Sequence, residues 1–246
     1  MRQYTYILCL FFVLYFNTIK AQTTFAEQIP GMQKYDPTKV VDPEYGIQLY
    51  EKLIFALGGD SVRYNKKGYN VQGWMEDYYT TGTILHKGFY EDGQLKVFKN
   101  FYPNGNVERS FRIIDMKRCE MIEYYQDSKV KSEIIFYDGN TQKQTDYYPN
   151  GVVSYIEESE KNNDYLYKRN SYKEDGNPTI IFEIIDKKKK TYIHKEYFEN
   201  GKLKEEGEMK FSLDASDYVK EGTWVYYDES GKETRKEKYH NGGKID

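Results

Sequence analysis

A five-residue stretch that occurs twice constrains this chain more than any other feature. FYPNG occupies residues 101–105, and YYPNG occupies residues 147–151. Proline favours the first central position of a type I turn and asparagine the second, while glycine accepts the left-handed backbone that a side chain would oppose. The two aromatic residues in front are typical of a strand, in which neighbouring side chains point to opposite faces. We therefore predict that each stretch ends one strand and turns the chain back as a β-hairpin.

The turns recur at a constant spacing. Gly82, Gly105, Ser128 and Gly151 are evenly spaced along the sequence. The series continues less regularly, and further turns lie midway between its members; these later and midway glycines are Gly176, Gly201, Gly231, Gly93, Gly139 and Gly242. A fixed period of about 20 to 50 residues indicates a repeat protein, and turns at half the period indicate two short strands per repeat, or about 15 strands in all. Residues 60–246 are therefore predicted to be all-β, an elongated antiparallel array of hairpins in one meandering sheet.

The composition agrees with a thin sheet. The sequence has 27 tyrosines, 17% aromatic residues, 30% charged residues and a mean hydropathy of −0.87. Aromatic residues favour strands, yet the low hydropathy does not provide a thick core. An array that grows in one dimension needs no thick core, because each repeat contacts only its neighbours.

At this point the sequence resembles a known family. Stretches such as GWMEDYYTTG and EGTWVYYDESGK, with two aromatic residues placed before a turn glycine, are similar to the MORN-repeat variant, whose members include YwqK-type antitoxin components of toxin–antitoxin systems. The resemblance covers roughly residues 68 to 242. It implies a MORN-like array of β-hairpins with a role in interaction, and it brings no catalytic motif.

Residues 1–21 are predicted to be a secretory signal peptide. Arg2 gives a positive start, the apolar run YILCLFFVLYF follows, and Ala21 supplies the small residue at the cleavage site. The run is too short to span a membrane as a helix. We therefore expect an exported protein that is periplasmic, at the cell surface or secreted, and not an integral membrane protein. Removal of the signal leaves Cys119 as a single cysteine, which we expect to be a half-buried free thiol.

One short helix is predicted for residues 42–59, after a linker formed by residues 22–41. Asp42 suits the N-cap, Pro43 suits the first helical position, and Gly58 ends the segment. Apolar residues at helical spacing form one stripe: Ile47, Tyr50, Leu53, Ile54 and Leu57. We expect this helix to cover an end or a face of the sheet.

The sequence contains no motif of an enzyme, a metal site or a cofactor site. His86, His194 and His240 lie far apart without the spacing of metal ligands, and we interpret them as scattered surface histidines. The basic run at residues 187–190 is interpreted as a solvated turn, because the acidic balance and the export signal argue against nucleic-acid binding. We therefore predict a non-enzymatic protein with no catalytic residues, no metal and no cofactor.

Recognition of another macromolecule is the predicted role, and the paired aromatic residues are its candidates. The candidate recognition residues are Tyr79, Tyr102, Tyr125, Tyr148, Phe198, Trp74 and Trp224, and we interpret the two tryptophans as occupying matching repeat positions. The turn glycines that hold the register are Gly82, Gly93, Gly105, Gly151, Gly201 and Gly231. The partner is expected to be a protein, such as a toxin or an envelope protein; the alternative is a cell-surface polysaccharide. Rings exposed at repeated positions would favour a sugar, and one unrepeated apolar patch would favour a protein.

Overall fold

The computed structural model describes residues 35–43, 47–162 and 164–245. The chain divides into two units, Met1–Met32 and Gln33–Asp246, and the described residues all belong to the second. The predicted signal peptide at residues 1–21 and the linker residues 22–34 lie outside the described residues. Within the described part, no helix has the length and apolar character that a membrane-spanning segment needs.

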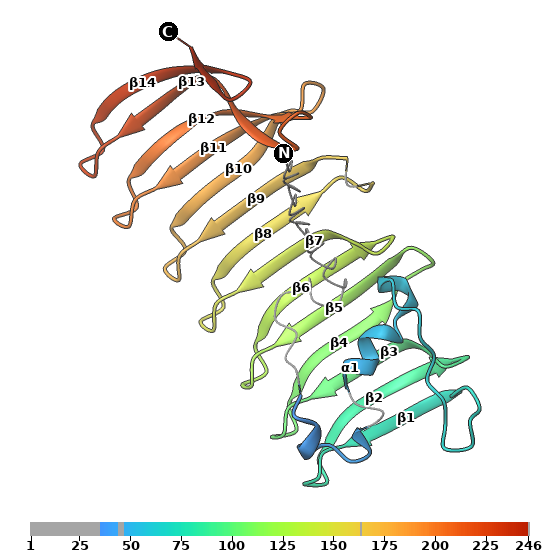
Figure 1. The fold of residues 1–246 in the computed structure, drawn as a ribbon. Coiled ribbons are helices and arrows are strands. Elements are labelled where there is room, and N and C mark those ends of the chain that lie inside the picture. Colours follow the sequence, from blue (N-terminus) through green and yellow to red (C-terminus); the bar gives the residue numbers. More distant parts are fainter. Residues whose placement is uncertain (1–34, 44–46, 163, 246) are drawn as a thin grey trace, which may run out of the picture. The chain divides into compact units, whose positions relative to one another are not determined.

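In the described part of the chain, fifteen antiparallel strands form one sheet and follow one another across it in sequence order (Figure 1). The predicted meandering all-β sheet is thereby confirmed. The strands are β1 (Gly73–Tyr78), β2 (Ile84–Glu91), β3 (Gln94–Phe101), β4 (Val107–Ile113), β5 (Arg118–Tyr124), β6 (Val130–Tyr137), β7 (Asn140–Tyr147), β8 (Val153–Ser159), β9 (Leu166–Tyr172), β10 (Pro178–Asp186), β11 (Thr191–Tyr197), β12 (Leu203–Ser212), β13 (Asp217–Tyr227), β14 (Glu233–His240) and β15 (Gly243–Ile245).

The turns that follow the paired aromatic residues all lie along one long edge of the sheet, which is formed by the ends of the strands. At the turn between β3 and β4, Phe101 pairs with Val107 and closes the hairpin. The N–H of Gly105 donates to the carbonyl of Tyr102 at 2.8 Å, as predicted for a tight turn. Just beyond each closing pair one extra residue forms a β-bulge, which increases the local twist. These bulge residues are Leu85, Glu108, Lys131, Ser154, Thr179, Lys204 and Thr234.

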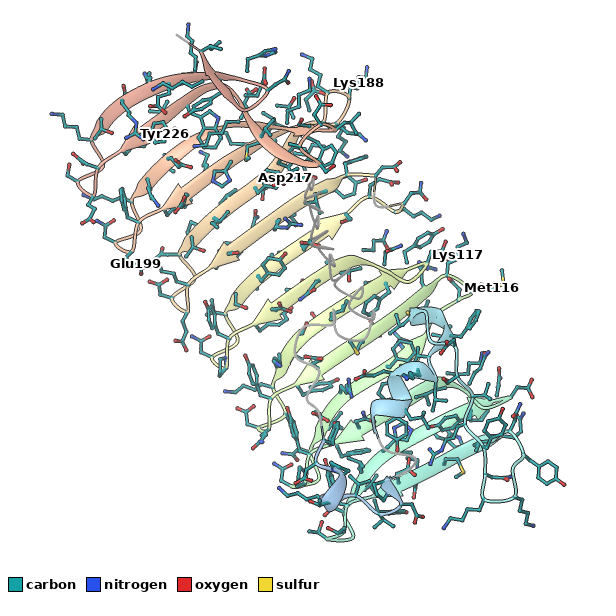
Figure 2. All side chains as sticks on the ribbon, viewed as in Figure 1. Met116, Lys117, Lys188, Glu199, Asp217 and Tyr226 are labelled. Atoms are coloured by element: carbon teal, nitrogen blue, oxygen red, sulfur yellow. The ribbon has the colours of Figure 1, made fainter. Side chains whose placement is uncertain are left out.

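The opposite edge of the sheet has more varied connections. Two-residue turns join three of its hairpins, and both residues of each turn have positive φ, as in type I′ turns. These are Asp92 with Gly93, Asp138 with Gly139, and Asn241 with Gly242. Longer loops form the remaining connections on this side, and Figure 2 shows Met116, Lys117 and Lys188 along this edge, with Glu199 on the other. The predicted midway turns are confirmed.

The segment before the sheet packs on one face of its first strands (Figure 1). The ring of Tyr50 stacks on His86 of β2 with the ring centroids 3.9 Å apart. The carbonyl of Leu53 accepts a hydrogen bond from the N–H of Leu95 in β3 at 2.9 Å. Tyr50, Leu53, Ile54 and Leu57 are all buried. The prediction that this segment covers a face of the sheet is confirmed.

The helix itself is shorter than the predicted range of 42–59. Helix α1 spans Ile47–Lys52, and a 3₁₀ turn, η4 (Phe55–Leu57), follows it, while a second 3₁₀ turn, η2 (Pro37–Lys39), lies in the predicted linker. The carbonyl of Lys52 accepts from the N–H of Ser61 instead of continuing the helix. Docking on the sheet has therefore overridden helical propensity. Residues 44–46 lie outside the described residues, so the N-cap role of Asp42 stays a prediction.

A second core lies in the C-terminal half of the sheet. Phe182 and Tyr192 stack with centroids 4.6 Å apart, and Tyr218 packs edge to face on both of them at 4.9 Å. Leu166 completes the buried cluster. Tyr218 belongs to the long hairpin of β12 and β13, whose connecting stretch departs from the repeat pattern. This departure from the repeat thus supplies a side chain that covers the core.

Cys119 is fully buried in β5, whereas we expected a half-buried thiol. Burial raises the pKa of its thiol to about 12. The side chain therefore acts as a small apolar core residue at neutral pH.

Candidate functional site

The second aromatic residue of each pair links one repeat to the next. The hydroxyl of Tyr102 donates to the carbonyl of Tyr124 at 2.7 Å, and the hydroxyl of Tyr125 donates to the carbonyl of Tyr147 at 2.6 Å. Equivalent bonds run from Tyr79 to Phe101 and from Tyr148 to Tyr172. Four of the candidate recognition residues therefore have a structural role, and their part in recognition stays a prediction.

The series of hydroxyl bonds changes toward the C-terminus. Lys173 stands where the earlier repeats have tyrosine, and its ammonium donates to the carbonyls of Phe198 and Glu199. Phe198, the last candidate of this row, has no hydroxyl and makes no equivalent bond. The asparagine of the turn adds a parallel link between repeats: Asn104 donates to the carbonyl of Gln126 at 3.2 Å, and Asn150 donates to that of Glu174 at 2.9 Å.

The predicted turn glycines all have positive φ. The φ values are 87° at Gly82, 76° at Gly93, 86° at Gly105, 86° at Gly151, 80° at Gly201 and 85° at Gly231. Ser128 keeps the same conformation with φ 69°. A Cβ on Gly105 or Gly151 would meet no atom within 4 Å, so only the backbone conformation requires glycine there.

Trp74 is the candidate residue that lies open on the surface. Its side chain is 58% exposed, and its ring packs edge to face against Phe89 with centroids 5.5 Å apart. Trp74 faces Phe89 of β2, Phe89 faces Val97 of β3, and Val97 faces Arg112 of β4. These four residues form one row across the sheet. A groove of about 350 Å³ opens here, on the side of the sheet opposite α1. Its lining residues are Trp74, Lys87, Val97, Phe98, Lys99, Ser110, Phe111 and Arg112.

The rim of this groove is basic. The ammonium of Lys87 lies 5.9 Å from the centre of the Trp74 ring and 2.8 Å from a carboxylate oxygen of Glu76. The guanidinium of Arg112 is paired with Glu120 at 2.6 Å, and this pairing raises its pKa. Lys99 is exposed beside them. The arrangement offers one large aromatic ring, an apolar floor whose exposed side chain is Val97, and a cationic border.

The two tryptophans do not occupy matching positions, in contrast to the prediction. Trp74 precedes the closing residue Tyr78 by four positions, whereas Trp224 precedes its closing residue Tyr227 by three. Successive residues of a strand alternate faces, so the two rings lie on opposite faces relative to their turns. Trp224 is 0% exposed, and its indole N–H donates to the carbonyl of Glu208 at 3.0 Å. It is a core residue.

A buried polar network lies under α1, and no motif in the sequence indicated it. Arg63 reaches both carboxylate oxygens of Asp77 at 2.6 and 2.9 Å, and it donates to the hydroxyl of Tyr90 at 3.0 Å. The Tyr90 hydroxyl is 3.0 Å from Nε2 of His86. Tyr50 also donates its hydroxyl to Asp77. Burial and the nearby Asp77 carboxylate raise the pKa of Tyr50.

His86 belongs to this network and is not a surface histidine, which corrects the prediction. It is 0% exposed, and its Nδ1 is 2.7 Å from Oδ1 of Asn100. Burial lowers the pKa of its imidazole to about 4. The ring is therefore neutral at neutral pH and acts as a hydrogen-bonding member of the core. His194 is half-buried, and His240 is exposed.

A second hollow lies among the loops of the opposite edge. It has a volume of about 580 Å³ and is lined by Asp115, Met116, Lys117, Arg118, Tyr137, Gln142 and Lys161. Two of its cations are paired, as at the groove: Arg118 with Asp115 at 2.7 Å and Lys117 with Asp138 at 3.6 Å. Residues 187–190 form an exposed turn on the same edge, as predicted. The Trp74 groove is the better candidate, because it joins an exposed aromatic ring to an apolar floor.

Comparison with known proteins places one hairpin in a family. Residues 193–210, from β11 through the turn into β12, match the family described as MORN repeat variant. No curated protein matches the sequence. A structure of an S. aureus TarM mutant with fondaparinux, α-GlcNAc-glycerol and UDP is similar at 11% identity and a TM-score of 0.26, covering 60% of this chain and 21% of that chain. A structure of TcdB2-TccC3-TEV is similar at 9% identity and a TM-score of 0.19, covering 70% of this chain and 14% of that chain.

The two structural likenesses are too weak to support an argument about fold or function. The family match agrees with the resemblance noted in the sequence, and the turn and closing pair of β11 and β12 recur along the sheet. The match therefore supports the MORN-repeat family for this repeat protein.

Proposed function

We propose that this chain is an exported, non-enzymatic recognition protein that binds a protein partner through the Trp74 groove. The observation that carries the proposal is the exposed ring of Trp74 above an apolar floor with a basic rim. Large aromatic residues are enriched at the energetic centres of protein interfaces. A MORN repeat variant is commonly associated with binding or recognition, which agrees with this use of the sheet.

The groove is not repeated along the sheet, and this favours a protein over a polysaccharide. Counted back four positions from each closing residue, the equivalents of Trp74 are Val97, Glu120, Lys143, Lys168, Ile193 and Thr223. A repetitive sugar polymer would be served by rings at repeated positions, whereas none of these equivalents is aromatic. One aromatic ring in one place is suited to a single anchoring side chain of a folded partner.

The basic rim indicates the chemistry of the partner. Lys87, Lys99 and Arg112 surround the apolar floor, and two of them, Lys87 and Arg112, already pair with Glu76 and Glu120 of this chain. A partner segment with an apolar anchor flanked by carboxylates would complement this rim. With the resemblance to YwqK-type antitoxins and the export signal, we propose a toxin or an envelope protein as this partner, and an immunity role outside the cytoplasm.

The experiment compares three immobilised forms of the protein: wild type, Trp74→Ala and Thr223→Ala. Thr223 is the exposed equivalent of Trp74 in a late repeat, so its replacement controls for a generic change at this position. Each form is incubated with envelope extract and with culture supernatant, and retained proteins are identified by mass spectrometry. We expect one protein that binds wild type and Thr223→Ala and is lost with Trp74→Ala, with affinity reduced tenfold or more.

Two results would contradict the proposal. If Trp74→Ala retains every protein that wild type retains, the groove is not the binding site. If retention survives protease treatment of the extract and is abolished by soluble polysaccharide, the carbohydrate alternative holds. Export is tested separately by fractionating cells that express the chain with and without residues 1–21, and equal distribution of the two forms would exclude the signal peptide.

A further inference from the structure

At one register position of the repeat, one hairpin carries facing residues that differ in charge from those of the other hairpins. In each repeat, the residue just before the closing aromatic residue faces the residue just after the bulge. These facing pairs are Asp77 with His86, Asn100 with Arg109, Glu123 with Ser132, Asp146 with Tyr155, Ser171 with Ile180, Glu196 with Glu205, and Tyr226 with Arg235.

Only one of these described pairs places two carboxylates opposite each other. Glu196 of β11 faces Glu205 of β12, whereas each of the other pairs has at most one acidic residue. Like charges directly opposite each other destabilise a sheet. A cation held between the two carboxylates would remove that cost, so the position suits a cation.

A third donor atom completes the cluster. His194 lies two residues before Glu196 on the same face of β11, and its Nε2 is 3.9 Å from Oε1 of Glu205. One ligand atom from each of the three side chains lies within 4.8 Å of the others, and all three side chains are half-buried. The three residues lie on paired strands and not on loops, so the backbone holds their positions firmly.

The packing around His194 holds its imidazole in place. The ring of Trp224 lies 5.5 Å from the imidazole and covers Gly207, the residue facing His194 on β12. A Cβ at Gly207 would come within 2.4 Å of the indole, so glycine is needed for this packing.

We propose that His194, Glu196 and Glu205 form a binding site for Zn²⁺. One imidazole nitrogen and two carboxylate oxygens are ligands that Zn²⁺ accepts in tetrahedral geometry, with the fourth position left for water or for a group of a partner. Contraction of the cluster by side-chain rotation brings the three atoms to a common ion. Mg²⁺ does not suit the site, because it prefers all-oxygen octahedral coordination.

Two lysines form ion pairs with these carboxylates and compete with a metal ion for them. Lys204 is 2.6 Å from Glu196, and Lys220 is 3.4 Å from Glu205. Lys220 keeps other partners when Glu205 turns to the metal, because its ammonium is 3.1 Å from the hydroxyl of Tyr226 and 3.8 Å from the centre of the Trp224 ring. Lys204 is largely exposed and can move into solvent. Both lysines lower the affinity for Zn²⁺ without blocking the site.

The test is titration of the purified chain, freed of metal by a chelator, with ZnCl₂ in a calorimeter, and with MgCl₂ as the comparison. We expect one Zn²⁺ per chain at micromolar concentration, a rise in the unfolding temperature, and no response to Mg²⁺. His194→Ala should weaken binding at least tenfold, since loss of a supporting residue alone costs tenfold or more. His240→Ala is the matched control, because His240 pairs with a single carboxylate, Glu221, at 3.0 Å, and it should bind like wild type.

Glu205→Gln separates metal binding from a merely structural role. It keeps the size of the side chain and removes one carboxylate ligand, so the folded variant should lose its response to Zn²⁺. Lys204→Met should tighten Zn²⁺ binding several-fold. The proposal is overturned if wild type binds no Zn²⁺ at millimolar concentration, if His194→Ala and folded Glu205→Gln bind like wild type, or if His240→Ala removes the binding.

Discussion

Ser128 offers a direct measurement of what the turn backbone costs. It is the one position of the evenly spaced series at which the turn holds a side chain, and its φ of 69° lies in the left-handed region. A residue other than glycine pays roughly 1–2 kcal/mol there. Glycine loses more backbone entropy on folding, which offsets about 0.5–1 kcal/mol of the gain. We therefore expect Ser128→Gly to stabilise the protein by about 0.5–1 kcal/mol.

The reverse substitution at the equivalent turn should have the opposite sign. Gly105→Ser places a side chain at φ 86°, and the added Cβ meets no atom within 4 Å, so the change acts only on the backbone. It should destabilise by about the amount that Ser128→Gly gains, and Gly105→Val should cost more, roughly 1–3 kcal/mol. Gly151→Val, at the same φ, should behave like Gly105→Val.

Urea unfolding followed by far-UV circular dichroism measures these changes in the free energy of unfolding. In thermal unfolding of a chain of this size, 1 kcal/mol corresponds to a change of about 2–4 °C in the unfolding temperature. The mutant pair serves as its own control, because both members exchange the same two residue types. If Ser128→Gly destabilises, or if Gly105→Ser leaves unfolding unchanged, the register of these hairpins is wrong.

Two further predictions concern burial and the links between repeats. Glu108 is 7% exposed, and burial raises the pKa of its carboxyl from 4.5 to about 7. Because the folded chain holds this proton more tightly than the unfolded chain, wild type should lose up to about 3 kcal/mol of stability as the pH rises from 4.5 to about 7. Glu108→Gln should lose less stability when urea unfolding is measured across that range. Tyr125→Phe removes the hydroxyl that donates to the carbonyl of Tyr147, and it should lower the free energy of unfolding by about 0.5–1.5 kcal/mol. Tyr124→Phe is the control, because Tyr124 does not make this bond, and it should cost less. Equal costs would show that the link contributes nothing to stability.

The hairpin array could be predicted because its information is local. Short turn stretches that end in glycine, or in serine at Ser128, define the turns by backbone geometry, and Phe101 and Val107 close the hairpin as the pattern indicates. The even spacing of the turns then orders the strands. Such signals need no knowledge of distant contacts, which is why strands, turns and their order were confirmed together.

The predicted register of the late repeat was wrong by one position, and the cause is physical. In YYDESG the closing residue is Tyr227, and Asp228 takes the place that Tyr79 holds in the first repeat, with its N–H bonded to the carbonyl of Lys232. The other aromatic residue of the pair, Tyr226, precedes the closing residue and lies on the face opposite to Tyr227. An aromatic pair is thus ambiguous by one position, and in a strand one position exchanges the two faces.

The burial of His86 could not be predicted, because it depends on contacts distant in sequence. Tyr50 stacks on its ring from the segment before the sheet, and Arg63 reaches the same network from a loop. The sequence near His86 reads like any strand with an exposed polar residue. The absence of a local signal is general for polar groups buried by a segment from elsewhere in the chain.

Repeated positions and unrepeated positions have different meanings in this sheet. The recurring tyrosines and asparagines are explained by hydrogen bonds that join one turn to the next, and the recurring glycines by their positive φ, so recurrence here marks structure. Trp74 and His194 do not recur, nor does the pairing of two carboxylates, Glu196 with Glu205, and nothing in the repeat requires them. Trp74 lies four positions before its closing residue and His194 lies three before Tyr197, so the two sites are on opposite faces of their hairpins. A partner bound at the groove therefore leaves the metal site uncovered. Glu205→Gln should keep the partner while it loses Zn²⁺, and Trp74→Ala should keep Zn²⁺ while it loses the partner, so either proposal can fail without the other.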